Sequence, residues 1–311
     1  MQLTGLLSFP LTPFTARDTV DLDVLAEHVE AQVAAGPAGL FVACGTGEFT
    51  ALSIVEYRQV LRTALATVAG RLPVYSGVGG GPRIAREFLT AAAESGVDGV
   101  LLLPPYLVHS PPAGVVDFVG YVTAAADVPV VVYQRANAIL DPASAVSLLD
   151  NENVIGIKDG EGDLELMRSL ITAVRGSGHP RAAEFGFFNG LPTAELSMPE
   201  YRAMGVPAYS SAVLCFLPEI ATAFYAALST GDDDTVRTLL REFYVPFGEL
   251  RKTTPGYAVS LVKAGARLNG LAAGPVRPPL RDVTPEHLQQ LKEIIARGRA
   301  ALERSEGCVT A

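Results

Sequence analysis

The feature that most constrains the fold is a series of eight short apolar segments in the first two thirds of the chain. Their starts lie about 29 residues apart on average, which is close to the length of one strand–helix unit of a parallel α/β protein. Runs such as Gly99–Leu103 are apolar without alternation, as expected of strands covered on both faces. The expected strands are Gly5–Phe14, Gly39–Gly45, Pro73–Gly80, Gly99–Tyr106, Pro129–Arg135, Val154–Gly160, Ala183–Gly190 and Ala208–Val213.

Amphipathic helices are expected between these strands. Asp141-Pro142, for example, offers an N-cap followed by proline at the first helical position. Eight strand–helix units favour an α/β fold of the closed (β/α)₈ TIM-barrel type. An open doubly wound sheet is the alternative, but no GxGxxG motif opens the first helix. The expected helices are Asp21–Ala34, Ser53–Ala69, Pro82–Ser95, Ser110–Ala126, Asp141–Leu149, Leu164–Val174 and Thr193–Met204.

The pattern changes after Val213, where only helix-like segments follow. One of these segments completes the barrel, and the others form a helical appendage without an obvious linker. We therefore expect a barrel over residues 1–235 and a C-terminal helical region, packed on the barrel, over residues 236–311. The expected helices are Pro218–Leu228, Asp232–Leu250, Tyr257–Leu268 and Thr284–Leu302.

The composition argues against several classes of protein. Hydrophobic residues make up 49% of the 311 residues and charged residues 18%, so a large core is expected. A net charge of −9 without any basic run argues against a nucleic-acid partner. The longest apolar runs, such as Val128–Tyr133, are too short to span a membrane, and Met1–Phe9 lacks the pattern of a signal peptide. Three widely spaced cysteines indicate reduced thiols, so a cytoplasmic protein is expected.

Lys158 is the first candidate catalytic residue, because active sites of such barrels lie at the carboxyl ends of the strands. The chain has four lysines against twenty arginines, and Lys158 is the only lysine of the barrel. Burial lowers the pKa of an ammonium group, and a neutral amine can attack a ketone. We expect Lys158 to form a Schiff base with a keto acid. The structural alternative is an ion pair with Asp159 or Glu161.

Two further segments can support this chemistry. Tyr133 ends the neighbouring expected strand, where its phenol could relay protons or could simply be a core tyrosine bonded to the backbone. Gly45-Thr46-Gly47 ends another strand and can offer backbone N–H groups and a hydroxyl to a carboxylate. The four histidines are dispersed, so neither a metal nor a cofactor is expected.

Together these pieces resemble the dihydrodipicolinate synthase/N-acetylneuraminate lyase family. The resemblance rests on the order and spacing of GTGE at residues 45–48, VVYQR around Tyr133 and GIKDG around Lys158. It implies a barrel, a lysine–keto acid Schiff base, a tyrosine relay and a homo-oligomer, either a tetramer or a dimer. Two departures from the synthases argue against dihydrodipicolinate synthesis. Gly45 replaces the first of two threonines, and Leu107 replaces a tyrosine that a neighbouring subunit borrows.

Six phrases resemble those members of the family that dehydrate and decarboxylate a six-carbon keto diacid. The resemblance therefore implies a decarboxylating hydro-lyase whose substrate has a second carboxylate and a hydroxyl to be bound. Candidate partners for these groups are Arg135, Asn137, Ser210 and Ser211, of which Arg135 suits a bidentate carboxylate pair. The phrases are GTGEFTAL, LLPPYLV, VVYQRANA, IGIKDGEGD, FFNGLPTAE and VPAYSSAV.

Two other functions stay open from the sequence. A class I retro-aldol lyase or a synthase would use the same Schiff base on another 2-keto acid. A non-catalytic keto-acid-binding protein would need no buried lysine, because a permanently charged arginine serves simple binding better.

Overall fold

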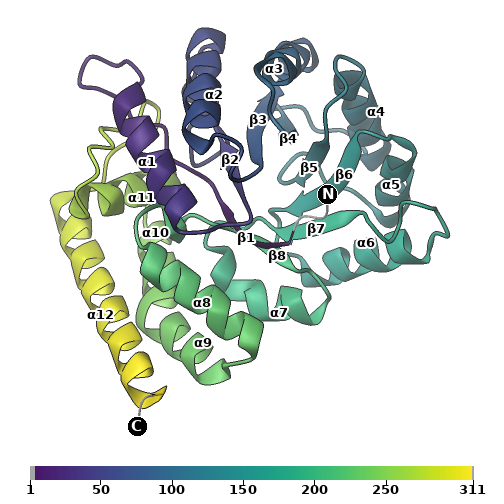
Figure 1. Ribbon diagram of the computed structural model, residues 1–311. Helices are drawn as coiled ribbons and strands as arrows, with labels where there is room; N and C mark the ends of the chain where they lie inside the picture. Colours follow the sequence, from purple (N-terminus) through teal and green to yellow (C-terminus); the bar gives the residue numbers. More distant parts are fainter. Residues whose placement is uncertain (1–3, 310–311) are drawn as a thin grey trace.

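The computed structural model describes residues 4–309, and its centre is a closed barrel of eight parallel strands. The strands follow one another around the barrel in chain order, and β8 closes it against β1 (Figure 1). The expected (β/α)₈ barrel is therefore confirmed. The strands are β1 Gly5–Ser8, β2 Gly39–Val42, β3 Val74–Gly80, β4 Gly99–Pro105, β5 Val130–Gln134, β6 Val154–Asp159, β7 Gly186–Asn189 and β8 Ala208–Ser211.

Eight helices surround the strands and cover the outside of the barrel. Several begin at a side-chain cap, of which Asp141 is the one that the sequence predicts. Asp141 accepts a hydrogen bond from the backbone of Ser144 ahead of Pro142, and Ser53 forms a capping box with Glu56. The helices are α1 Leu22–Ala34, α2 Ile54–Val68, α3 Pro82–Ser95, α4 Pro112–Thr123, α5 Pro142–Ser147, α6 Leu164–Gly176, α7 Met198–Ala203 and α8 Pro218–Thr230.

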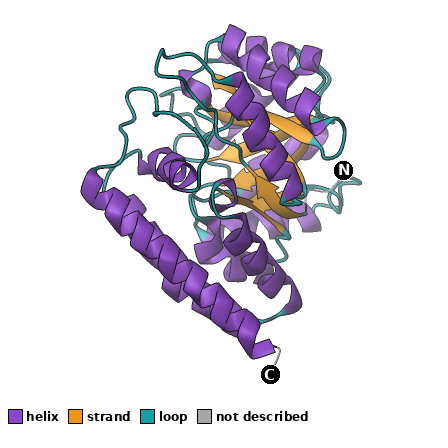
Figure 2. Cartoon of the chain, turned by 60° about the vertical axis from the view of Figure 1, so that its left-hand side comes forward, coloured by secondary structure: helices purple, strands orange, loops and turns teal. Residues whose placement is uncertain are grey.

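Four more helices follow the barrel: α9 Asp233–Leu239, α10 Val245–Lys252, α11 Tyr257–Leu268 and α12 Pro285–Val309. The long helix α12 runs along one side of the molecule, where it contacts α8, α9, α10 and α11 (Figure 2). None of the described helices is long and apolar enough to cross a membrane.

Several elements differ in their bounds from the sequence prediction, and proline accounts for two of the differences. The single helix expected over residues 232–250 contains a π-helical turn, Leu240–Tyr244, between α9 and α10. Pro246 follows this turn and has no N–H to continue the regular ladder. The first strand ends at Ser8 rather than Phe14, because Pro10 and Pro13 lack the backbone N–H donors that a longer parallel strand needs.

The apolar residues form two clusters, one between strands and helices and one inside the barrel. Their membership alternates along strands such as β2 and β5. In β5, Val131 and Tyr133 belong to the interior cluster, whereas Val130 and Val132 face the helices. Phe41 stacks inside the barrel between the rings of Phe9 and Tyr75, at centroid distances of 4.8 and 4.6 Å. The interior is thus a packed core, and any site must lie at its ends.

Candidate active site

Lys158 and Tyr133 lie together at the carboxyl ends of two neighbouring strands. β5 and β6 pair in parallel, with Tyr133 directly opposite Lys158, so both side chains leave the sheet on the same face. That face is the barrel interior, where Lys158 is 5% and Tyr133 7% exposed. The two residues singled out in the sequence are therefore neighbours in space.

The amine of Lys158 lies among aromatic rings. Its Nζ is 4.0 Å from the ring centre of Phe9 and 4.4 Å from that of Tyr133. Burial lowers the pKa of Lys158 to about 7, while the nearby Cys44 thiol opposes this shift and the charge of Arg135 adds to it. At neutral pH a large fraction of the amine is therefore unprotonated and able to act as a nucleophile.

The carboxylates that follow Lys158 in the chain are engaged elsewhere. Asp159 accepts a hydrogen bond from the hydroxyl of Tyr201, and Glu161 accepts one from the backbone of Ala136. Within the described part of the chain, Lys158 forms no ion pair with either. The alternative of a structural ion pair at this strand end is therefore not supported.

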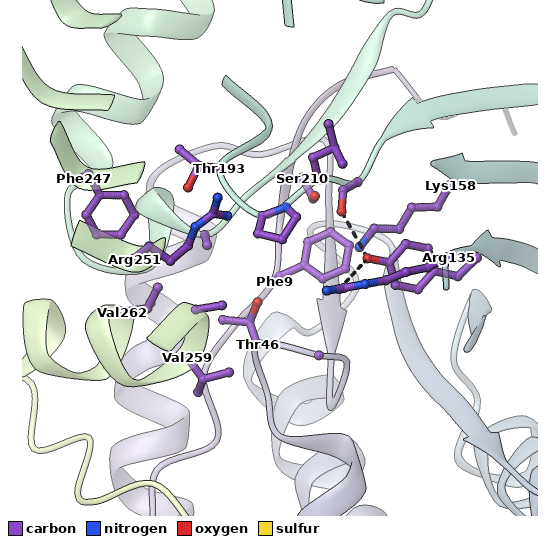
Figure 3. A pocket seen from close by; sticks show the side chains of 17 residues that line it. Phe9, Thr46, Arg135, Lys158, Thr193, Ser210, Phe247, Arg251, Val259 and Val262 are labelled. Atoms are coloured by element: carbon purple, nitrogen blue, oxygen red, sulfur yellow. Dashed lines mark hydrogen bonds between the residues drawn. The ribbon is translucent and has the colours of Figure 1, made fainter. Parts of the chain in front are cut away.

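The hydroxyl of Tyr133 is held between a carbonyl and a guanidinium group. It donates to the carbonyl oxygen of Gly190 at 3.2 Å and accepts from Nη1 of Arg135 at 3.2 Å (Figure 3, dashed lines). Burial raises the pKa of Tyr133, and the cation of Arg135 opposes that rise. A phenol with one donor and one acceptor at hand, beside an amine, can pass protons to and from a reacting group.

Two glycines leave the space that these side chains occupy. A Cβ atom at Gly190 would lie 2.1 Å from Cε of Lys158, and one at Gly160 would lie 2.6 Å from the ring of Tyr133. Neither glycine has a positive φ, so the requirement is for space and not for backbone conformation. This explains why glycine follows strands β6 and β7 directly.

The Gly45-Thr46-Gly47 segment borders the same cavity only in part. Gly45 and Thr46 line it, whereas Gly47 does not. A Cβ atom at Gly47 would lie 3.0 Å from the backbone of Ala43, and its carbonyl accepts a hydrogen bond from Thr12 at 2.7 Å. Gly47 therefore serves the packing of the turn, and only Gly45 and Thr46 of this segment border the cavity.

Of the four candidate partners for the rest of the substrate, the cavity brings together two. Arg135 and Ser210 line it. Asn137 lies outside and ties two loop segments together, because its amide donates to the carbonyls of Pro105 and Val108 at 2.7 and 2.6 Å. Ser211 also lies outside the lining. It follows Ser210 in β8 and so faces the opposite side of the sheet, where it donates to buried Glu195 at 2.5 Å.

The wall opposite Lys158 comes from residues that the sequence did not single out. Arg251 and Phe247 on α10, together with apolar residues of α11, form much of it, and Thr193 borders it from the segment after β7 (Figure 3). An amphipathic pattern shows that a helix has a buried face, but it does not show which surface that face covers. Arg251 therefore had no signal in the sequence that separates it from an ordinary surface arginine.

The cavity is small and carries positive charge. Its volume is about 190 Å³, which suits a small organic acid better than a nucleotide. Arg135, Lys158 and Arg251 line it, and among the described residues of the lining none carries a carboxylate. A negatively charged ligand is therefore favoured.

The sequence as a whole matches a known family. The model of the dihydrodipicolinate synthetase family matches residues 2–297. The chain belongs to this family. A protein of Streptomyces coelicolor named probable 5-dehydro-4-deoxyglucarate dehydratase 1 is 49% identical over 98% of this chain and 96% of its own. A Bacillus subtilis protein with the name probable 5-dehydro-4-deoxyglucarate dehydratase is 37% identical over 94% of this chain and 92% of its own.

Solved structures of the dihydrodipicolinate synthetase family share the whole architecture. Dihydrodipicolinate synthase from Oceanobacillus iheyensis superposes with a TM-score of 0.87 at 25% identity, covering 96% of this chain and 97% of the other. YagE from Escherichia coli K12, solved in complex with pyruvate, gives a TM-score of 0.85 at 25% identity, with 96% and 99% covered. The family resemblance stated from the motifs is thus confirmed, and so is the likeness to its dehydratase members.

Proposed function

We propose that the protein is a decarboxylating 5-dehydro-4-deoxyglucarate dehydratase that works through a Schiff base on Lys158. The names of its relatives supply the substrate. The observation that carries the proposal is the amine of Lys158, buried without a counter-ion, with a pKa of about 7, at the edge of a cavity lined by two arginines and no acid among the described residues. The products are 2,5-dioxopentanoate, carbon dioxide and water.

The first step captures the substrate. The carboxylate next to the ketone, C6, binds at the backbone of Gly45 and at Thr46, where a glycine lets the ligand approach closely. The neutral amine of Lys158 attacks the C5 ketone. Tyr133 then delivers a proton to the leaving oxygen, and water departs as the iminium forms. Arg135 stabilises the phenolate form of Tyr133, since it donates to the phenol oxygen.

The iminium then serves as an electron sink. Loss of a proton from C4 gives an enamine, and expulsion of the C3 hydroxyl as water gives a conjugated iminium. Breaking of the C1–C2 bond sends its electron pair into this conjugated system, and C1 leaves as carbon dioxide. Protonation at C4 and C3 converts C2 from an enol into an aldehyde, and hydrolysis frees Lys158. Ser210, which lines the cavity, holds a substrate hydroxyl in this proposal.

Product analysis tests this proposal. Incubation with 5-dehydro-4-deoxyglucarate should release carbon dioxide and a five-carbon semialdehyde, both followed by mass spectrometry. Borohydride should trap a substrate adduct on Lys158, and Lys158→Ala should abolish turnover and adduct together. Pyruvate plus a three-carbon semialdehyde would instead identify an aldolase on the same site. Absence of both turnover and adduct would rule out the proposal that the protein is a Schiff-base enzyme.

We also propose that the enzyme is a cytoplasmic homo-oligomer, either a tetramer or a dimer. Cys44 and Cys215 are buried free thiols, in keeping with a reducing compartment. Tyr106, Leu107 and Val108 expose 69%, 76% and 59% of their surface near the mouth of the barrel, and such an apolar group is typical of a surface that meets another subunit. Sedimentation analysis of the purified protein would decide it, and a monomer would contradict the proposal.

A further inference from the structure

Arg251 is a cation on the far wall of the cavity, and it forms no salt bridge within residues 4–309. It belongs to α10 and lies across the cavity from Lys158, beside Thr193 and Phe247 (Figure 3). Its Nη1 atom is buried and has no hydrogen-bond partner within the described part of the protein. Arg251 as a whole is half-buried, but a buried N–H donor without a partner is costly, so the position of Nη1 indicates a ligand that completes its contacts.

Thr193 adds a second polar atom at the same place. Its hydroxyl is buried, lines the cavity and likewise has no partner among the described residues. The residue has a φ of 60°, which is unfavourable for a β-branched side chain. Strained residues of this kind concentrate at binding sites. Two unpartnered donors, one of them charged, therefore meet at one end of the cavity.

Arg135, the other arginine of the lining, is engaged at the opposite end. Its Nη1 donates to the hydroxyl of Tyr133 at 3.2 Å, close to Lys158. Burial lowers the pKa of Arg251 and the charge of Arg135 adds to this shift, while Glu195 and Glu249 oppose it. Arg135 and Arg251 therefore repel each other across the cavity. A ligand with negative charge at both ends would relieve this repulsion.

We propose that Arg251 binds the carboxylate remote from the ketone, with the Thr193 hydroxyl beside it, and so selects keto diacids over keto monoacids. This inference rests on the proposed function, because Lys158 holds the ketone and Gly45 and Thr46 hold the adjacent carboxylate. A guanidinium group can bind a carboxylate with two parallel hydrogen bonds. In the proposed reaction this is the carboxylate that departs, and Arg251 orients its bond to C2 until carbon dioxide leaves.

Two acids of equal chain length isolate the contribution of the remote carboxylate. 2-Oxoadipate carries it, and 2-oxohexanoate has a methyl group there instead. Calorimetry on the full-length protein should show tighter binding of 2-oxoadipate. Arg251→Gln should weaken the binding of 2-oxoadipate by about ten- to a hundredfold, the range for a hydrogen bond to a charged group. It should leave the affinity for 2-oxohexanoate unchanged. Arg251→Lys should restore part of the preference, since the charge returns without the fork.

Lys252→Gln is the matched control, because Lys252 is the next residue of α10, is exposed and pairs only with Glu249 among the described residues. It should leave the affinity for both acids unchanged. The proposal is overturned if Arg251→Gln keeps the preference for 2-oxoadipate. It is also overturned if the substitution weakens the binding of both acids equally, as replacement of a purely structural residue would.

Borohydride trapping on Lys158, measured with the same acids, separates this inference from the proposed function. A calorimetric preference that Arg251→Gln removes, without any trapped adduct in the unaltered protein, would uphold the role of Arg251 and reject the Schiff base. If adducts are trapped on Lys158 but Arg251→Gln keeps the preference for 2-oxoadipate, the Schiff base is upheld and the role of Arg251 is rejected.

Discussion

In the proposed mechanism, Lys158 owes its reactivity to what surrounds it. An ammonium group in water keeps its proton far above neutral pH, and an ion pair would strengthen that hold. Here the amine faces the rings of Phe9 and Tyr133, and the carboxylate of Asp159 is bonded to Tyr201 instead. The burial that disfavours the charged form of Lys158 is therefore the same feature that supplies a nucleophile.

The pH dependence of kcat/KM should report this environment. Below pH 7 the free enzyme holds Lys158 mainly as the ammonium form, which cannot attack a ketone. As the pH rises through about 7, the neutral fraction grows and kcat/KM should rise with it, in step with the pKa of about 7. Initial rates at subsaturating substrate across this range are the measurement. A rise centred near the ordinary lysine pKa would show that burial does not act on this amine as described.

Reasoning from sequence succeeded at single residues where strand geometry is regular. Lys158 and Tyr133 could be predicted as neighbours because parallel strands end at the same edge and their side chains alternate. The same alternation separates Ser210, which lines the cavity, from Ser211, which does not. The sequence alone could not decide between them, because a shift of one residue in the register exchanges the two faces.

At the scale of elements, the ends of β6 and β7 must leave room for one another. Gly190→Ala places a methyl group on the path of the Lys158 side chain, at 2.1 Å from Cε and 2.3 Å from Cγ. The flexible side chain can move aside, so the fold should persist while the amine is displaced. A misplacement of about 1 Å can cost on the order of a hundredfold in rate, and a loss of kcat/KM of about that size is expected.

Gly120→Ala provides the control for that substitution. Gly120 lies within α4 and has open space where its Cβ would be, so alanine there should leave activity unchanged and stabilise the protein by about 0.4–1 kcal/mol. Steady-state kinetics and borohydride trapping, with circular dichroism as the check on folding, provide the comparison. Full activity in Gly190→Ala would show that Lys158 does not need this space.

The elements after the barrel show where prediction from sequence stopped. Their helical character could be read from periodicity, but the placement of α10 and α11 over the cavity could not, because it depends on long-range packing. The π-helical turn before Pro246 also shifts the phase of α10. Phase decides which side chain of the helix meets the cavity, so Arg251 could be identified only in three dimensions.

At the scale of the molecule, a buried ion pair joins the barrel to the later helices. Nζ of Lys263 on α11 lies 2.7 Å from Glu48, and the two side chains are 0% and 2% exposed. Lys263 also donates to the carbonyl of Pro275, and Glu48 accepts from the backbone of Arg277. Glu48 directly follows the Gly45-Thr46-Gly47 turn, so this pair holds α11 against the loop that borders the cavity.

Breaking that pair should destabilise the whole protein. Lys263→Met leaves the Glu48 carboxylate buried without its cation, which costs about 3–5 kcal/mol in comparable cases. Urea unfolding should show a lower midpoint for Lys263→Met, and adding Glu48→Gln should recover much of the loss because it removes the orphaned charge. If Lys263→Met alone unfolds like the unaltered protein, the pair does not hold these parts together.

The cavity has two walls of separate origin. The ends of β5 and β6 carry Tyr133 and Lys158, whereas α10 and α11 supply the opposite side. Substitutions in α10 and α11 can therefore change which acid binds without changing the residues proposed to form the imine. Related enzymes on this scaffold could evolve new substrate specificities through substitutions in a stretch of about 18 residues, Val245–Val262. A laboratory library for new substrates should be concentrated in the same stretch.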